Sequence, residues 1–223
     1  MDTPRGFPLW LRWVGANALA ETLGLGLSLA ADVLIISRVA SAQTVLASTA
    51  SILLMTASGA IEGAIVGLLQ WSVLRRAFPG VARRAWVLAT ILGAMIAWFL
   101  GSLPSTLMDM GAQETGTAAQ EPAQATVLLL AAAMGLFLGA VLGLPQRRVL
   151  QRVVPGAWLW VPANCVAWAL GLPVVFAAVD LAYGSGSAAA SVAILVLALA
   201  LTGAIVGAVH GLALVKLARQ DRS

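Results

Sequence analysis

Long apolar segments alternate with short polar connections along the chain. Six segments are predominantly apolar, approximately residues 11–37, 45–74, 85–108, 125–146, 157–182 and 190–216. Each is at least as long as the roughly 18–20 apolar residues that an α-helix needs to span a bilayer. The apolar residues run continuously instead of alternating with polar ones, which argues against transmembrane β-strands. The pattern predicts an all-α polytopic membrane protein with six transmembrane helices.

The composition agrees with this prediction. Hydrophobic residues make up 61% of the 223 residues and charged residues 10%, against about 25% charged in soluble domains. A water-soluble protein of this size could not bury so much apolar surface. We therefore expect a single membrane domain comprising residues 1–223.

The basic residues predict the orientation of the helices. Twelve of the 13 Lys and Arg fall on the same side of a six-helix path as both termini: Arg5, Arg12, Arg75, Arg76, Arg83, Arg84, Arg147, Arg148, Arg152, Lys216, Arg219 and Arg222. The other side carries Arg38 and the acids Asp32, Asp109, Glu114, Glu121 and Asp180. The positive-inside rule then places both termini in the cytoplasm, with the protein in a bacterial cytoplasmic (inner) membrane.

The residues at these helix ends suit a membrane interface better than a nucleic acid. We expect the basic pairs to contact lipid headgroups or partner subunits, in particular Arg75, Arg76, Arg147, Arg148 and Arg152. Six tryptophans near the same ends predict an interfacial aromatic belt: Trp10, Trp13, Trp71, Trp86, Trp158 and Trp160. The net charge of +4 therefore does not indicate nucleic-acid binding.

The sequence also contains an internal repeat. A series of residues returns 76 positions later: Gly59, Gly63, Gly67, Gln70, Val73, Leu74, Arg76, Pro79 and Gly80 recur as Gly135, Gly139, Gly143, Gln146, Val149, Leu150, Arg152, Pro155 and Gly156. A third copy, 64 positions further on, retains Gly203, Gly207, His210, Leu214 and Lys216. Residues of the odd-numbered segments repeat at an offset of 147, so that Trp13 and Asn17 recur as Trp160 and Asn164.

These offsets predict three two-helix hairpins related by a pseudo-threefold axis normal to the membrane. The repeat units cover approximately 10–80, 84–156 and 157–218, and a polar outer connector is expected at 109–124. Spacing of four places each set of glycines on one helix face, where helix backbones can approach closely in lipid as in a glycine zipper. The predicted packing glycines are Gly59, Gly63, Gly67, Gly135, Gly139, Gly143, Gly203 and Gly207.

Polar residues on these apolar helices are candidates for function. Gln70, Gln146 and His210 each follow the last glycine by three residues, so they share the glycine face. They could form a hydrogen-bonded ring, or a polar gate or ligand-binding ring. His210 could alternatively ligate a haem or chlorophyll. The chain has no second histidine and no haem-attachment motif, so no cofactor is required by the sequence.

Two carboxylates are predicted at similar depth inside the first hairpin. Glu21 and Glu62 lie 11 and 12 residues from the cytoplasmic ends of their segments, at roughly 16–18 Å. Intramembrane acids are functional candidates because burying them is costly. If the two face each other, they are expected to share a proton, with Asn17 as a further partner. The alternative is a protonated, hydrogen-bonded packing pair.

No catalytic or metal-binding motif is present. The chain has one histidine and one cysteine, so the usual nucleophile–base pairs are nearly impossible to assemble. We expect a non-catalytic integral membrane protein, either an accessory subunit of a membrane complex or a binder of lipid or another hydrophobic ligand. The alternative is a small proton- or cation-coupled transporter or channel that uses Glu21 and Glu62.

The repeated G-x-x-x-G-x-x-Q-x-x-V-L-x-R-x-x-P-G element spans Gly63 to Gly80 and Gly139 to Gly156. It resembles an element of uncharacterised multi-pass bacterial membrane proteins. The resemblance extends over much of the chain and implies no activity. The third copy retains fewer positions of this element, and His210 replaces the glutamine.

Overall fold

The structure is a computed structural model that describes residues 6–39, 45–115 and 122–220. Its elements are α1 (Phe7–Val39), α2 (Val45–Ala77), α3 (Arg83–Thr115), α4 (Gln124–Leu150), the short 3-10 helix η1 (Ala157–Leu159), α5 (Trp160–Gly184) and α6 (Ala188–Gln220). All six α-helices are long and apolar enough to cross a membrane. This confirms the all-α prediction and indicates a multi-pass membrane protein.

The helices extend beyond the apolar segments from which they were predicted. α1 begins at Phe7, α6 ends at Gln220, and α3 continues to Thr115. The polar connector predicted at 109–124 is therefore too long. Residues 109–115 include Met, Ala, Gln and Glu, which favour helix even where hydropathy has fallen. Arg5, Glu121 and Arg222 lie outside the described residues.

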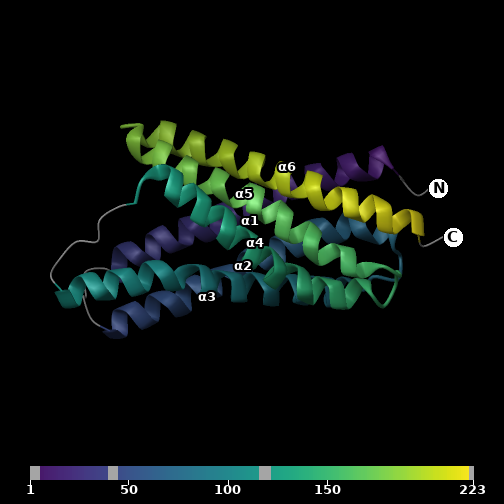
Figure 1. Cartoon of the computed structure of the whole chain (residues 1–223), viewed down its shortest axis with the longest axis horizontal. Helices are drawn as coiled ribbons and strands as arrows, with labels where there is room; N and C mark the ends of the chain where they lie inside the picture. Colours follow the sequence, from purple (N-terminus) through teal and green to yellow (C-terminus); the bar gives the residue numbers. More distant parts are fainter. Residues whose placement is uncertain (1–5, 40–44, 116–121, 221–223) are drawn as a thin grey trace.

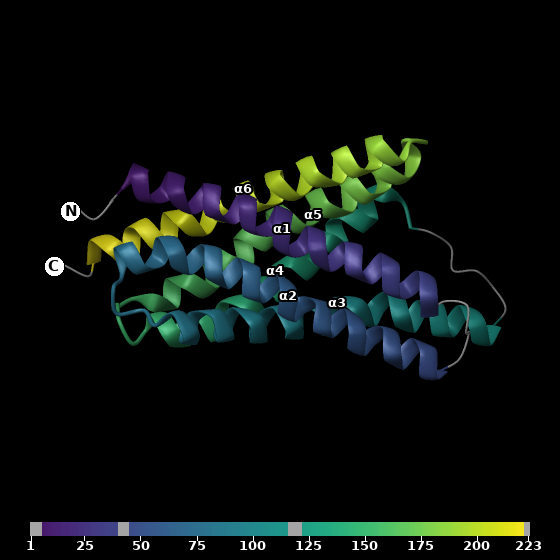
Figure 2. The same cartoon turned by 180° about the vertical axis from the view of Figure 1, so that it is seen from behind.

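The six helices form a closed ring. Each packs against its neighbours in the chain, and α6 packs against α1. Both described ends of the chain and the connections α2–α3 and α4–α5 lie at one end of the bundle, here called the termini end (Figure 1). At the opposite end, called the loop end, the C-terminal part of α3 and the start of α4 diverge in both views (Figures 1 and 2). The bundle is thus tight at the termini end and wider at the loop end.

Glycines line three of the helix interfaces. The residues concerned contact α3 (Gly59, Gly63 and Gly67), α5 (Gly135, Gly139 and Gly143) and α1 (Gly203 and Gly207). A Cβ atom built at Gly63 would lie 2.5 Å from the Cα of Ile91. At Gly139 it would meet the backbone carbonyl oxygen of Asn164. The missing side chains therefore allow these helix backbones to approach more closely than any other residue would permit.

An aromatic layer fills the bundle near the termini end. Trp13, Trp86 and Trp160 are fully buried, and Trp160 packs edge-on against the other two with ring centroids 5.8 and 5.9 Å apart. Leucines that recur in the sequence repeat surround them: Leu74, Leu150 and Leu214. The prediction of an interfacial belt is wrong for these three tryptophans, because they lie on inward helix faces. Trp158, in contrast, is 62% exposed.

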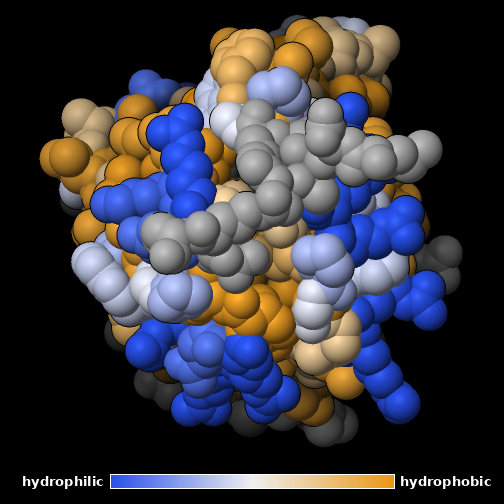
Figure 3. All heavy atoms as spheres, turned by 90° about the vertical axis from the view of Figure 1, so that its right-hand side faces the viewer, coloured by the Kyte–Doolittle hydropathy of each residue, from blue (hydrophilic) through white to orange (hydrophobic). Residues whose placement is uncertain are grey.

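Basic residues surround the termini end. Figure 3 shows hydrophilic side chains around the rim of this end of the molecule. Basic residues in the last turns of α2, α4 and α6 are Arg75, Arg76, Arg147, Arg148 and Arg219. The guanidinium of Arg75 lies over the Trp71 ring at 5.0 Å from its centroid, and that of Arg83 at 5.8 Å. These cation–π contacts hold charged groups beside an apolar surface, as a membrane interface requires.

Candidate functional site

A polar layer lies beside the aromatic layer, on the side facing the loop end. Gln70, Gln146 and His210, called here the polar ring, are 1–4% exposed and border one small cavity. The Nε2 of Gln146 donates to Oε1 of Gln70 at 3.3 Å. The three residues therefore converge, as expected from their shared place on the glycine faces.

Two of the buried tryptophans donate hydrogen bonds to the polar ring. The indole Nε1 of Trp160 donates to Oε1 of Gln146 at 2.8 Å, and that of Trp13 donates to Nδ1 of His210 at 2.8 Å. These bonds join adjacent helices, α5 to α4 and α1 to α6. These bonds fix the orientation of the ring side chains and hold His210 in the tautomer with its proton on Nε2.

The third tryptophan has a different environment. Nε1 of Trp86 is buried without a hydrogen-bond partner among the described residues. The glutamine on the adjacent helix α2 is Gln70, whose Oε1 accepts from Gln146 and whose Nε2 donates to Oδ1 of Asn17 at 2.9 Å. Asn17 also donates from Nδ2 to the carbonyl oxygen of Trp13 at 2.8 Å. Asn17 was expected to support Glu21, but its bonds are to these residues instead.

Glu21 and Glu62 lie next to the polar ring. Both line a cavity of about 20 Å³, here called the chamber, together with all three ring residues. Glu21 is 1% exposed, and its Oε2 has no hydrogen-bond partner in the described part of the chain. Glu62 is 6% exposed and accepts a hydrogen bond on Oε2 from Nε1 of Trp98 at 2.6 Å. The structure therefore brings the two glutamates to one cavity and does not direct them both into lipid.

A larger cavity of about 230 Å³, here called the outer cavity, lies on the loop-end side of the chamber. Five helices, α1 to α5, contribute to its walls, which are almost wholly apolar. Its polar groups are few and include Glu62, Trp98 and Ser102. Glu62 borders both the outer cavity and the chamber.

A third acid is also buried in the first hairpin. Asp32, predicted to lie with the charges of the outer side, is 4% exposed within α1. Its Oδ1 accepts a hydrogen bond from Oγ of Ser58 at 2.7 Å, and Ser28 Oγ donates to the carbonyl oxygen of Ser58 at 2.8 Å. Asp32 follows Glu21 by 11 residues within α1, close to three full helical turns, which places the two acids on the same face of this helix. Buried polar side chains thus extend along the α1–α2 interface.

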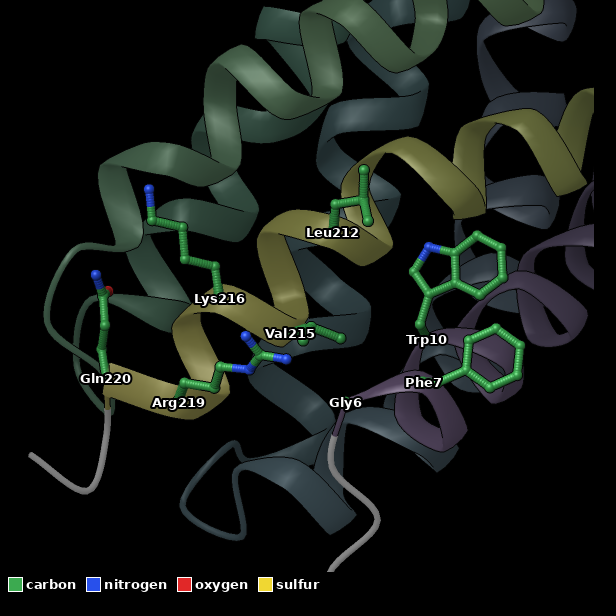
Figure 4. A pocket seen from close by; sticks show the side chains of 8 residues that line it. All are labelled: Gly6, Phe7, Trp10, Leu212, Val215, Lys216, Arg219 and Gln220. Carbon is green, nitrogen blue, oxygen red and sulfur yellow. The ribbon is translucent and has the colours of Figure 1, made fainter.

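A surface groove of about 750 Å³ separates the start of α1 from the end of α6. Phe7 and Trp10 stack with ring centroids 5.7 Å apart on one side, and Trp10 donates from Nε1 to the carbonyl oxygen of Ala208 at 2.9 Å. On the other side, Arg219 extends toward Gly6 and Lys216 extends away from it (Figure 4). The groove therefore combines apolar walls with two exposed cations.

The other predicted headgroup contacts are distributed around the termini end. Arg75, Arg76, Arg148 and Arg152 are exposed, whereas Arg147 is partly buried and its Nε has no hydrogen-bond partner among the described residues. None of them lines the chamber or the outer cavity.

Comparison with protein-family models, curated proteins and solved structures found no match to this chain.

Proposed function

We propose that this protein is a non-catalytic membrane protein that binds a hydrophobic ligand in the outer cavity. The observation that carries the proposal is an apolar cavity of about 230 Å³ whose described lining includes a single carboxylate, Glu62. Ligand sites are commonly apolar hollows with a few polar groups that fix orientation. An alkyl chain suits these walls, and a cationic or hydrogen-bond-donating head suits Glu62.

Blocking the outer cavity tests this proposal. Gly101 borders the cavity, and a Cβ atom there would lie 3.8 Å from Cδ1 of Leu138, an ordinary contact. We expect Gly101→Leu to leave the fold intact and weaken binding of a brominated medium-chain alkylamine about tenfold, or ~1.4 kcal/mol. Bromine quenching of tryptophan fluorescence reports binding, since Trp98 and Trp168 line the cavity.

The matched control is Gly15→Leu. Gly15 is exposed, and nothing lies within 4 Å of a Cβ atom built there, so this variant should bind the amine as the wild type does. Equal quenching of the wild type and both variants would mean that the amine partitions into detergent or lipid and not into the cavity. That result would contradict the proposed ligand site.

A second candidate function is proton- or cation-coupled transport. It is favoured by Glu62, which borders the outer cavity on one side and the chamber with Glu21 on the other. Buried intramembrane acids that border a cavity are typical of ion and proton pathways. Proton flux into proteoliposomes, compared between the wild type and the double variant Glu21→Gln/Glu62→Gln, distinguishes transport from ligand binding alone.

We also propose that the three hairpins form a pseudo-threefold arrangement. Support comes from three glycines at one position of the sequence repeat, Gly63, Gly139 and Gly203. Each packs against the backbone of a residue at a second shared position, and these partners are Thr90, Asn164 and Asn17. Glu21 and Glu62 occur only in the first hairpin and break this symmetry. In this proposal they are the residues specialised for function.

For the orientation, we propose that the termini end faces the cytoplasm of a bacterial cell, where its basic residues contact anionic lipids or partner subunits. The clustering of cations at this end supports it. The groove between α1 and α6 offers apolar walls for an acyl chain beside Lys216 and Arg219 for a headgroup.

Reversing the charge of the groove tests the lipid contact. We expect Lys216→Glu/Arg219→Glu to retain anionic phospholipid roughly 30-fold less tightly, since each basic residue contributes about 1 kcal/mol near an anionic headgroup. Native mass spectrometry of the protein titrated with phosphatidylglycerol measures this. The control Arg84→Glu/Arg148→Glu changes two exposed cations outside the groove, and an equal loss in both variants would contradict a specific site.

A further inference from the structure

Departures from the sequence repeat converge on the chamber. Where the first hairpin has Glu21, the other two copies have Ala94 and Trp168; where it has Glu62, they have Leu138 and Thr202; where the third hairpin has His210, the others have Gln70 and Gln146. The three exceptional residues come from α1, α2 and α6. All three line the same cavity.

The chamber has the size and lining of a site for one small polar molecule. Its volume of about 20 Å³ exceeds the ~10–15 Å³ that a single water molecule needs. The helices α3, α4 and α5 present uncharged polar groups to it from Thr90, Gln146 and Asn164. Among the described residues, the titratable side chains that line it are Glu21, Glu62 and His210. Asp32, the other buried acid of α1, bonds to Ser58 and does not line it.

The hydrogen-bonding groups at the chamber call for a molecule that both donates and accepts. Glu21 is almost completely buried, and its Oε2 requires a donor. Nδ1 of His210 already accepts from Trp13, so the neutral imidazole keeps its proton on Nε2 as a donor. A metal cation cannot accept from an imidazole N–H, whereas a water molecule can accept from His210 and donate to Glu21.

We propose that the chamber holds one water molecule through which Glu21 and Glu62 share a single proton, and that His210 is the positioning residue that orients this water. The inference deepens the second proposed function, since it gives the protonatable site that coupled transport would use. Two ionised carboxylates bordering a cavity of this size would repel each other and lack solvation, which favours one proton between them.

The proton moves between the acids without changing the water. The O–H bond of protonated Glu62 breaks as its proton passes to the water oxygen, and one water proton passes to the carboxylate of Glu21. The pair carries one negative charge before and after the transfer. His210 remains neutral throughout because its Nδ1 lone pair is engaged by Trp13.

Infrared spectroscopy of the reconstituted full-length chain counts the protonated carboxyl groups directly. A shared proton predicts the same integrated C=O band of protonated carboxyl in the wild type, Glu21→Gln and Glu62→Gln, because a single remaining buried acid takes the proton. In the double variant, the integrated C=O band should be smaller by the intensity of one protonated carboxyl group. Asp32 also interacts electrostatically with Glu62, so the count is repeated in an Asp32→Asn background, in which the differences belong to Glu21 and Glu62 alone.

Two results would overturn the shared proton. A loss of one carboxyl in each single variant would show two separately protonated acids, and an unchanged band in the double variant would show that neither carries a proton. If the double variant fails to fold, the carboxyl band of the wild type compared with the single variants still distinguishes one shared proton from two separate ones. The infrared count does not depend on transport, so a negative flux assay would contradict the second proposed function and leave this inference standing.

A separate infrared measurement tests for the bound water and for the role of His210 in positioning it. An O–H stretching band that shifts in H₂¹⁸O is expected in the wild type and should be lost in Val206→Ile, which adds a methyl group to the chamber wall. In His210→Gln, which installs the residue of the other two repeats, the band should change frequency while the carboxyl count stays the same. Absence of an ¹⁸O-sensitive band in the wild type, or an unchanged band in His210→Gln, would refute the bound water or the positioning role respectively.

Discussion

Trp160→Ala is expected to lower the unfolding free energy by about 3–5 kcal/mol, the range for removing a buried tryptophan. Trp160 is fully buried between Trp13 and Trp86, so its removal leaves a cavity that neighbouring rings cannot fill. It also deprives Oε1 of Gln146 of its indole donor. Thermal unfolding in detergent, followed by circular dichroism, measures the loss.

The chain provides a matched control two residues away. Trp158 is 62% exposed, so Trp158→Ala should change the unfolding temperature little. Equal destabilisation by the two substitutions would contradict the inward orientation of Trp160. Trp160→Phe separates the two contributions further, because it removes the N–H donor while retaining much of the aromatic volume.

Gly139→Ala is expected to destabilise the protein by about 1–3 kcal/mol, as overpacking of a close interface does. A Cβ atom at this position would meet the backbone carbonyl of Asn164 and lie 2.7 Å from the Cα of Cys165. Backbone atoms cannot rotate away, so α4 and α5 would have to separate. The same thermal unfolding measurement applies.

Gly15→Ala controls for the intrinsic effect of the substitution. Alanine favours helix over glycine by up to about 1 kcal/mol, and Gly15 has open space around it. This variant should therefore be as stable as the wild type or slightly more stable. A stabilising effect of Gly139→Ala would show that the α4–α5 interface is less closely packed than described.

The sequence predicted those features that depend on long-range periodicity. Six apolar segments were enough to predict the helices, because spanning a bilayer imposes a minimum length. The meeting of Gln70, Gln146 and His210 followed from their common spacing to the glycines, since helical geometry places them on one face. Glu21 and Glu62 could be assigned a depth on the same grounds.

Features that depend on helix rotation could not be predicted. α1 and α2 are apolar on most faces, so nothing in their pattern determined whether Glu21 and Glu62 would point into the bundle. The tryptophans were misplaced because an amphipathic indole suits a membrane interface and a hydrogen-bonded core equally well. A signal was nevertheless present, because Trp13, Trp86 and Trp160 each lie four residues before a polar side chain at the same repeat position. The hydrogen bond from Trp98 to Glu62 had no sequence signal.

The packing of α6 against α1 has a consequence for biosynthesis. Gly203 and Gly207 cover the backbone of α1 around Asn17, and His210 lies beside Trp13. Because α1 is translated before α6, this face of α1 has no packing partner from α6 until that helix has been inserted. Until α6 has been inserted, the polar groups of α1 at this seam lack the partners that α6 supplies. A chain truncated before α6 should therefore retain an uncovered face on α1 and leave Nε1 of Trp13 without its acceptor.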